Sequence, residues 1–280
     1  GVSNMFEKFY KYQSLGNDFI VFDCYLEDFK SVLSKIAEKQ FSNFVQNLCD
    51  RHFGIGADNV LILIKNQDVN VPEVSLPEVF IFNSDGSRAE TCLNGLRCIS
   101  LHLFAKYSFA RNFKIKMHKR IFESKVNSDF TITNKTELGE CQENQSIKIL
   151  DRNLFGHVIN VGNPHFIVLE KIDLKFLKQN GSLIEKHKDF ACGTNVEFIW
   201  LDKSIKNKYH MLVHERGCGI TLSCGSGVAA VMTALFNLQK IKTQQKICIN
   251  MLGGEIISWI DEQNKVNLEA SAHFVFEGLL

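Results

Sequence analysis

Two cysteines stand in local sequences that predict chemical reactivity. Cys92 is followed by Leu93-Asn94-Gly95 and Cys224 by Gly225-Ser226-Gly227, and both segments lead into apolar stretches with helical periodicity. A thiol at a helix start lies beside unpaired backbone N–H groups and the positive end of the helix dipole, which lower its pKa from ~8.5 toward ~3.5–7.5. The same N–H groups can hold a carboxylate. Each segment therefore predicts a thiol or thiolate beside a bound carboxylate.

Three polar motifs occur twice in the same order, once in each half of the chain. Corresponding asparagines lie 146 and 136 residues apart, and the two cysteines lie 132 residues apart. Three repeats in register predict an internal duplication. The paired segments are Leu15–Phe19 with Val161–Phe166, Gly56–Val60 with Gly193–Val196, and Cys92–Gly95 with Cys224–Gly227.

Two related halves that face each other across a cleft would place one thiol on each side of a bound molecule. A thiolate could then remove a proton from one face of a carbon while the other thiol returns a proton to the opposite face. The roles exchange in the reverse direction, and the product is the inverted stereocentre. No feature of the sequence demands pyridoxal phosphate, so we expect no cofactor.

The elements that must position these residues are short strands and a few helices. Runs rich in β-branched and aromatic residues predict strands, and apolar residues at helical spacing predict helices. Together they predict an α+β fold with two helix-plus-sheet halves. The expected strands cover 19–22, 60–64, 79–82, 147–150, 157–161, 166–169, 196–201, 209–213, 246–250 and 255–260, and the expected helices cover 31–49, 96–106 and 228–238.

An ordered series of motifs from about residue 9 to residue 280 resembles the diaminopimelate epimerase family. The resemblance implies two pseudo-symmetric domains, each a sheet wrapped on a central helix, with the active site in the cleft between them. It implies domains at 1–135, with a strand at 268–280 returning to the first, and at 136–267. The motifs are 16–19, 51–58, 82–87, 92–98, 162–165, 193–196, 215–217, 224–227, 253–254 and 272–278.

The resemblance also implies a reaction and a set of site residues. The reaction is interconversion of LL- and meso-diaminopimelate without a cofactor or metal, with Cys92 and Cys224 as the paired acid and base. His165 and Glu215 would adjust the two thiols. The implied substrate-binding residues are Asn17, Asn59, Asn83, Leu93, Asn94, Asn163, Asn195, Glu215, Arg216, Gly225 and Ser226.

Three positions depart from the family pattern. Leu93 replaces a glycine, and a left-handed conformation there would cost about 1 kcal/mol or more. Ile220 replaces a common acid, and Asn59 replaces Gln or Gly, which leaves Asn59 a weak binding role. We expect these changes to affect substrate preference and rate rather than reaction type. One alternative is therefore a racemase of another amino acid such as glutamate, and another is a non-catalytic ligand-binding or thiol-redox protein on the same scaffold.

Composition excludes several other classes of protein. The 280 residues carry 32 Lys and Arg against 31 Asp and Glu, so no global field attracts nucleic acid or an anionic membrane. No apolar run reaches the ~18 residues of a membrane span, and no signal peptide is visible, so we expect a cytoplasmic protein with a small-molecule substrate. A homodimer is plausible within the family.

The other cysteines are expected to be buried structural thiols. Nine cysteines are too few for a disulfide scaffold, and a reducing compartment argues against disulfides. Five residues separate Cys92 from Cys98 and Cys218 from Cys224, a spacing that suits zinc poorly. The remaining thiols are Cys24, Cys49, Cys141, Cys192 and Cys248.

Overall fold

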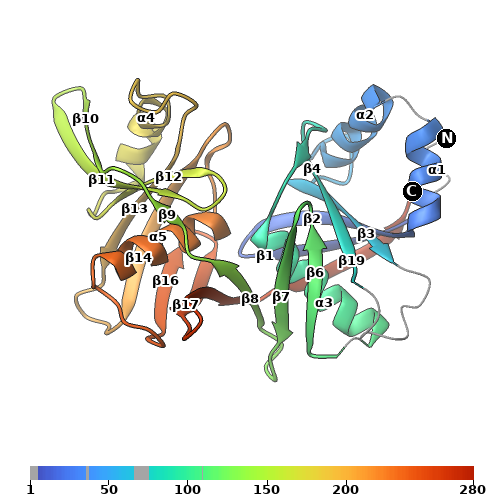
Figure 1. Ribbon diagram of the computed structural model, residues 1–280. Helices are drawn as coiled ribbons and strands as arrows, with labels where there is room; N and C mark the ends of the chain where they lie inside the picture. The colour runs from blue at the N-terminus through green and yellow to red at the C-terminus, as the bar shows by residue number, and fades with distance from the viewer. Residues whose placement is uncertain (1–5, 36–37, 66–75, 109) are drawn as a thin grey trace. The chain divides into compact units, whose positions relative to one another are not determined.

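The computed structural model describes residues 6–35, 38–65, 76–108 and 110–280. The chain forms two compact units of mixed helix and sheet. In Figure 1 the first runs from blue to green and includes the red C-terminal segment, and the second runs from green through yellow and orange toward red. Unit 1 comprises residues 1–134 and 271–280, and unit 2 comprises residues 135–270. The α+β fold predicted from the sequence, with two units each built around a helix, is confirmed.

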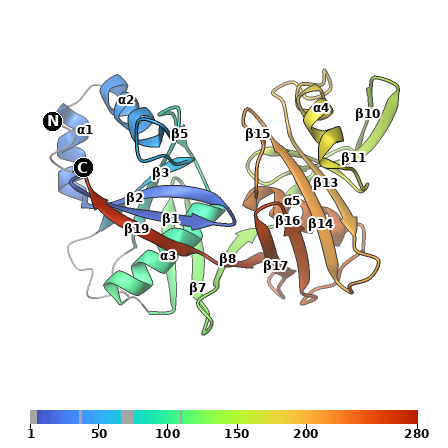
Figure 2. The same ribbon diagram turned by 180° about the vertical axis from the view of Figure 1, so that it is seen from behind.

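Unit 1 wraps its strands around helix α3 (Leu93–Tyr107), which packs against β1, β2, β7 and β19 (Figure 2). Strand β2 runs parallel to β3, and β4 runs parallel to β6, while the other pairings of the unit are antiparallel. The strands are β1 (Lys8–Ser14), β2 (Asn17–Tyr25), β3 (Asn59–Lys65), β4 (Glu78–Asn83), β5 (Arg88–Ala89), β6 (Asn112–Met117), β7 (Arg120–Val126), β19 (His273–Leu279) and β8 (Ile132–Glu137), whose last three residues belong to unit 2.

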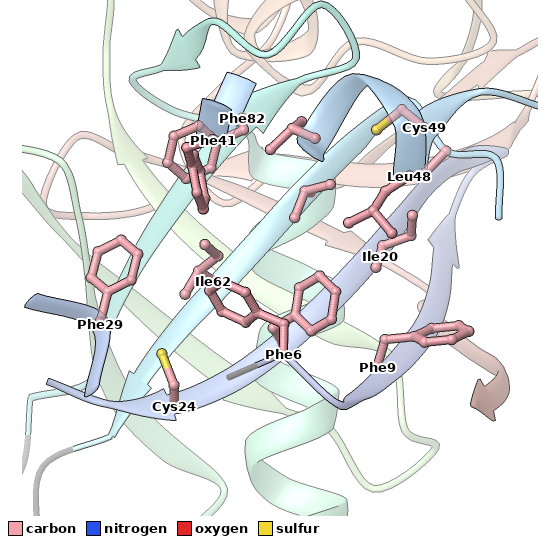
Figure 3. Packing of buried hydrophobic residues seen from close by; sticks show 14 of the residues in the cluster. Phe6, Phe9, Ile20, Cys24, Phe29, Phe41, Leu48, Cys49, Ile62 and Phe82 are labelled. Atoms are coloured by element: carbon pink, nitrogen blue, oxygen red, sulfur yellow. The ribbon is translucent and has the colours of Figure 1, made fainter. Parts of the chain in front are cut away.

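Helices α1 (Leu26–Lys35) and α2 (Glu38–Cys49) cover the other side of this sheet. Phe41, Val45 and Leu48 recur at helical spacing and are all buried, so α2 turns one apolar face toward β3. Figure 3 shows Phe41 beside Phe82 in this core, where their ring centroids lie 4.9 Å apart in an edge-to-face arrangement. The apolar layer between these helices and the sheet holds β2 and β3 in place, and the polar motifs of unit 1 lie at the ends of these strands.

Unit 2 has the same plan around helix α5 (Gly225–Asn237), which packs against β11, β12, β13, β17 and β18. Strand β12 runs parallel to β13, and β14 runs parallel to β16. Helix α4 (Leu174–Glu185) packs against β13 and β14. The strands are β9 (Glu140–Cys141), β10 (Gln145–Ile149), β11 (Arg152–Asn160), β12 (Pro164–Val168), β13 (Asn195–Leu201), β14 (Lys208–Glu215), β15 (Gly219–Ile220), β16 (Ile247–Met251), β17 (Gly254–Ile260) and β18 (Lys265–Ala270).

The duplication predicted from the motifs is visible in strand order and register. In the parallel pair of unit 1, Phe19 lies opposite Asn59, and in that of unit 2, His165 lies opposite Asn195. Three glycines of unit 1 with positive φ have counterparts with positive φ in unit 2, at matching turns. These pairs are Gly16 with Gly162, Gly56 with Gly193, and Gly86 with Gly217.

The structure also differs from the sequence-based elements. The helix expected over 31–49 is two helices, α1 and α2, and residues 36 and 37 between them lie outside the described residues. Helix α4 and strands β1, β6, β7, β8 and β18 were not expected, whereas β19 lies within the strand expected over 268–280. In β7 Phe122, Ser124 and Val126 are buried and the residues between them are exposed, which is the alternation of a strand with one face turned inward.

No helix in the parts of the chain that the structure describes is long and apolar enough to cross a membrane.

Candidate active site

Cys92 is the N-cap of α3, as the sequence predicts. Its backbone is extended, with φ −150° and ψ 106°, and its Sγ accepts a hydrogen bond from the Gly95 N–H at 3.4 Å. The thiol also lies 3.7 Å from Asn17 Oδ1, to which it can donate. Leu93 is the first residue of the helix and does not have a positive φ, so the left-handed strain considered for it is absent.

Asn17 and Asn94 form an oriented pair of amides beside the Cys92 thiol. Asn17 Nδ2 donates to Asp58 Oδ2 at 2.8 Å, which turns Asn17 Oδ1 toward Cys92 and Asn94. Asn94 Nδ2 donates to Asn17 Oδ1 at 3.3 Å. Asn94 Oδ1 in turn accepts from the Arg97 guanidinium. Hydrogen bonds from both sides therefore fix which atom each amide presents.

Arg97 supports this pair from the core of unit 1. Its side chain is fully buried, and its Nε donates to Ser14 Oγ at 2.9 Å. Burial lowers the pKa of the Arg97 guanidinium to about 10. An arginine buried beneath the amides, without a carboxylate in its described contacts, serves to hold Asn94 and Ser14 in place.

The Asp58 that orients Asn17 belongs to a charged network at the base of the site. Arg51 donates to both carboxylate oxygens of Asp18, at 2.8 and 2.9 Å, and to Asp58 at 3.0 Å. Lys11 donates to Asp18 at 2.8 Å. Burial alone would raise the pKa of Asp18, but hydrogen bonds from Arg51 and Lys11 hold it below its ordinary value. The ionised network keeps Asp58 and Asn17 in one arrangement.

Asn59 and Asn83 form a second amide pair in unit 1. They lie opposite each other on β3 and β4, and Asn59 Nδ2 donates to Asn83 Oδ1 at 3.1 Å. Asn83 Nδ2 donates to Ser87 Oγ at 2.9 Å. The structure thus brings Asn17, Cys92 and Asn94 into direct contact and sets Asn59 and Asn83 as a separate pair.

Cys224 is the N-cap of α5, as the sequence predicts. Its backbone has φ −137° and ψ 108°, and its Sγ accepts from the Gly227 N–H at 3.3 Å. Ser226 Oγ also lies 3.3 Å from this sulfur, and Gly225, the first helical residue, is buried. The cap geometry repeats that of Cys92.

The expected low pKa of a helix-start thiol is wrong for Cys224. Burial, followed by the negative charges of Glu215 and Glu197, raises the pKa of this thiol well above its ordinary value. These effects outweigh the helix dipole, because the sulfur is almost completely removed from water. Cys224 is therefore a protonated thiol at neutral pH in this structure.

Glu215 lies at the end of β14 next to Cys224. Its Oε1 accepts from Thr221 Oγ1 at 2.5 Å. Burial of the carboxyl group raises its pKa, although hydrogen bonds from Thr221 and Cys224 act in the opposite direction. Ile220, which replaces the acid of the family pattern, packs against the apolar core of unit 2.

His165 is fully buried between two oxygen acceptors. Its Nδ1 lies 2.6 Å from Glu197 Oε1, and its Nε2 lies 3.1 Å from Asn163 Oδ1. Glu197 was not among the residues singled out from the sequence. The sequence does contain a signal for it, since Glu197 is an acid inside the apolar strand expected over Val196–Leu201, and acids are rarely buried unless they are paired.

Asn195 and Arg216 lie on adjacent strand ends of unit 2. Asn195 Nδ2 donates to the Pro164 carbonyl at 2.9 Å, and Asn195 Oδ1 accepts from the Arg216 backbone N–H at 2.9 Å. The Arg216 guanidinium donates to the Cys192 carbonyl at 3.2 Å, while the residue as a whole is exposed. An exposed guanidinium next to fixed amides suits a carboxylate ligand.

The other cysteines match the expectation only in part. Each of the nine cysteines lies in the described residues, and none forms a disulfide. Burial raises the pKa of Cys24 to about 12 and that of Cys49 to about 11, and Cys98 is fully buried. Burial was wrongly expected for Cys141, Cys192 and Cys218, which lie at chain segments between the larger elements and are exposed.

Across the described part of the chain, no three His, Cys, Asp or Glu residues are grouped as a metal ion would require. Each unit instead offers a thiol at a helix N-terminus, with backbone N–H groups and oriented amides around it. This arrangement is suited to proton transfer next to a bound carboxylate.

Solved structures show which fold the chain has. A probable proline racemase from Agrobacterium radiobacter K84 superposes with a TM-score of 0.72 at 9% identity, covering 98% of this chain and 92% of the other. A phenazine biosynthesis protein of the PhzF family from Enterococcus faecalis gives 0.69 at 11% identity, covering 98% of both chains. The fold is therefore that of the racemases, epimerases and PhzF proteins.

Sequence comparison gives the family. Residues 9–142 and 157–274 match the diaminopimelate epimerase family. Proteins named diaminopimelate epimerase from Prochlorococcus marinus strain NATL1A and Carboxydothermus hydrogenoformans are 32% and 31% identical, covering 98% and 97% of this chain and 99% and 98% of their own lengths. The chain belongs to the diaminopimelate epimerase family, and it is an isomerase.

Proposed function

We propose that the protein interconverts LL- and meso-diaminopimelate, with Cys92 and Cys224 as the paired acid and base and without pyridoxal phosphate. The observation that carries this proposal is the repeated cap: two thiols occupy the same position at the start of two equivalent helices. The family match and the names of the relatives support the choice of substrate. The proposal requires both thiols to reach one substrate carbon from opposite faces.

In one direction of the proposed reaction, Cys92 is the base and Cys224 is the acid. The buried Cys224 thiol is protonated and ready to give its proton to the carbon. Cys92, half-buried beside neutral amides, removes the α-proton as a thiolate. In the reverse direction the Cys224 thiolate is stabilised by the Gly227 N–H and the Ser226 hydroxyl.

The substrate has two ammonium and two carboxylate groups, and the site supplies partners for both kinds. Gly225, Ser226 and Asn94 lie at the helix starts, where N–H groups stabilise the carboxylate next to the reacting carbon as charge develops. Glu215 binds an ammonium group of the substrate, and Arg216 binds one of its carboxylates. Asn17, Asn83, Asn163 and Asn195 complete the polar contacts, and Asn59 and Leu93 have weaker roles. We further propose a cytoplasmic homodimer.

Exchange of the α-proton with solvent tests this proposal. In deuterated buffer with reductant, the wild type should place deuterium at the inverted α-carbon of diaminopimelate, read by NMR. Cys92→Ala and Cys224→Ala should each lose epimerisation, while Cys98→Ala, at a buried thiol of α3, should keep it. Full activity in either of the first two variants would falsify the two-cysteine mechanism.

A second candidate keeps the mechanism and changes the substrate. Leu93 and Ile220 are both apolar and stand at positions where the family has glycine or an acid, which favours another amino acid such as glutamate. A panel of single amino acids and diaminopimelate, assayed with reduced thiols, decides between them. An absence of α-proton exchange on every substrate would instead favour a ligand-binding or thiol-redox protein.

A further inference from the structure

A buried carboxylate lies in strand β13 of unit 2, outside the set of residues that the proposed chemistry uses. Glu197 is fully buried, and so are its neighbours Val196 and Phe198. An ionised carboxylate in an apolar strand is strongly unfavourable unless partners compensate it. Its Oε1 accepts from His165 Nδ1 at 2.6 Å, but its Oε2 has no hydrogen-bond partner among the described residues. A buried oxygen left unsatisfied points to a function rather than to stability.

Both ring nitrogens of His165 face oxygen atoms. Nδ1 faces the Glu197 carboxylate, and Nε2 faces Asn163 Oδ1 at 3.1 Å. An imidazole with an oxygen acceptor at each nitrogen donates from both, and that form is the imidazolium. The short contact with Glu197 is typical of a charge-assisted hydrogen bond. Since Nε2–H donates to Asn163 Oδ1, the NH₂ group of Asn163 points away from the ring.

The Glu197 carboxylate also lies against the first turn of α5. A Cβ atom added at Gly227 would come within 2.7 Å of Glu197 Oε1, so the glycine is what allows this approach. The titratable groups that face Glu197 are His165 from β12, Glu215 from β14 and the Cys224 cap of α5. The carboxylate is thus placed between the histidine and the second thiol.

Unit 1 shows that the fold does not need a charge at this place. The counterparts of His165 and Glu197 are Phe19 and Leu61, at the same register of the parallel pair β2–β3. A Cβ atom added at Gly95 would lie 3.2 Å from Phe19 and 3.1 Å from Leu61. Two apolar side chains therefore cover the start of α3 where an ion pair covers the start of α5.

We propose that Glu197 is a positioning residue that keeps His165 protonated and, through it, orients the Asn163 amide toward the substrate. The proposal rests on the proposed function for the role of Asn163 as a substrate contact. Glu197 does not itself touch the substrate. It holds the ring by one hydrogen bond, and the ring holds the amide by the other.

The first test is the charge of the His165 ring in the whole protein without substrate. In ¹⁵N NMR at pH 7.5, both ring nitrogens of wild-type His165 should carry protons, and Glu197→Gln should give a neutral ring. Asp202→Asn is the matched control, because Asp202 holds His210 through a similar contact of 2.8 Å elsewhere in unit 2. It should leave the His165 signals unchanged. A neutral ring in the wild type would overturn the proposal without any variant.

The second test separates positioning from a structural role by kinetics. Glu197→Gln should raise KM for diaminopimelate about ten- to hundredfold, with a smaller change in kcat, because an oriented donor to a charged group is lost. A merely structural role would reduce the folded fraction and hence kcat, and it would leave KM unchanged. Unchanged KM in Glu197→Gln, at wild-type melting temperature, would also overturn the proposal.

A double variant keeps the test independent of folding. His165→Phe with Glu197→Leu installs the pair found in unit 1, and it should melt at or above the wild-type temperature, because apolar residues often replace buried ion pairs without loss. The double variant should show the rise in KM expected for Glu197→Gln, or no measurable turnover. A wild-type KM in the double variant would contradict the proposal. If the wild type does not act on diaminopimelate, the proposed function fails, and the charge of the His165 ring still decides this inference.

Discussion

Cys92 and Cys224 cap helices α3 and α5 in the same way. Each residue is extended, and each sulfur accepts from the backbone N–H three residues further on, at 3.4 and 3.3 Å. Their surroundings differ, because Cys92 adjoins the neutral Asn17 amide while Cys224 is buried near Glu215 and Glu197. The two halves thus share the cysteine cap, but the charged groups near the sulfur differ between them.

The raised pKa of Cys224 predicts slow alkylation. Without substrate at pH 8, iodoacetamide should modify Cys224 slowly, since the thiolate is the reactive form and burial with two nearby carboxylates disfavours it. Glu215→Gln removes one negative charge and should speed the reaction several-fold, as measured by peptide mass spectrometry. Glu262→Gln, at an exposed residue, is the control. Rapid modification of wild-type Cys224 at pH 7 would contradict the assignment.

Glu215 should cost stability at neutral pH. Burial raises the pKa of Glu215 in the folded protein above its ordinary value of 4.5, so the folded state binds the proton more tightly than the unfolded state does. The protonated side chain therefore contributes fully to the free energy of unfolding below pH 4.5. This contribution is lost as the pH rises through the raised pKa. Glu215→Gln should therefore melt at a higher temperature than wild type at pH 7.5, with a difference that shrinks toward pH 4. Its activity should fall about a hundredfold or more. A lower melting temperature at pH 7.5 would count against this account.

Arg97 should matter for both stability and substrate binding. Arg97→Met leaves Asn94 Oδ1 and Ser14 Oγ without this donor inside unit 1, which should lower the free energy of unfolding by about 1–3 kcal/mol. Urea denaturation measures the loss. KM should also rise, because Asn94 Oδ1 loses the donor that fixes its orientation. Arg88→Met, at an exposed arginine of β5, should change neither quantity by a comparable amount.

Asp58 should act through Asn17. Asp58→Ala removes the acceptor that turns Asn17 Oδ1 toward Cys92, and we expect kcat/KM to fall about tenfold, in line with the loss of one charged hydrogen bond. Asp129→Ala removes a carboxylate that organises an exposed turn, and it should keep full activity. Equal activities of the two variants would show that the amide needs no such support.

The helix caps could be predicted from the sequence because their signal is local. A cysteine three residues before a glycine, at the start of an apolar stretch, is sufficient to place Cys92 and Cys224. Helix α4 was missed because Asn180-Gly181 at its centre is typical of a turn. The structure uses Gly181 for close packing, since a Cβ atom there would lie 2.3 Å from the His214 ring.

The electrostatics of the site depend on contacts that the sequence does not display. The thiol pKa of Cys224 is raised by burial and by Glu197, which precedes it by 27 residues and reaches it only through strand pairing. Arg97 likewise looks like a surface ion-pair partner in sequence, and its burial beneath Asn94 follows from the wrapping of strands around α3. Local sequence patterns therefore identify the reactive side chains, whereas their pKa values depend on tertiary packing.

Strand β19 has a consequence for how the protein is made. This strand, near the end of the chain, pairs along β1 at its beginning, with Lys8 opposite Leu279. During synthesis unit 1 therefore lacks one of its strands until residues 273–279 have been made, whereas unit 2 is contiguous and all of its residues have been made by then. Domains usually fold in the order of their synthesis, but here we expect unit 2 to complete its fold before unit 1, which contains Cys92.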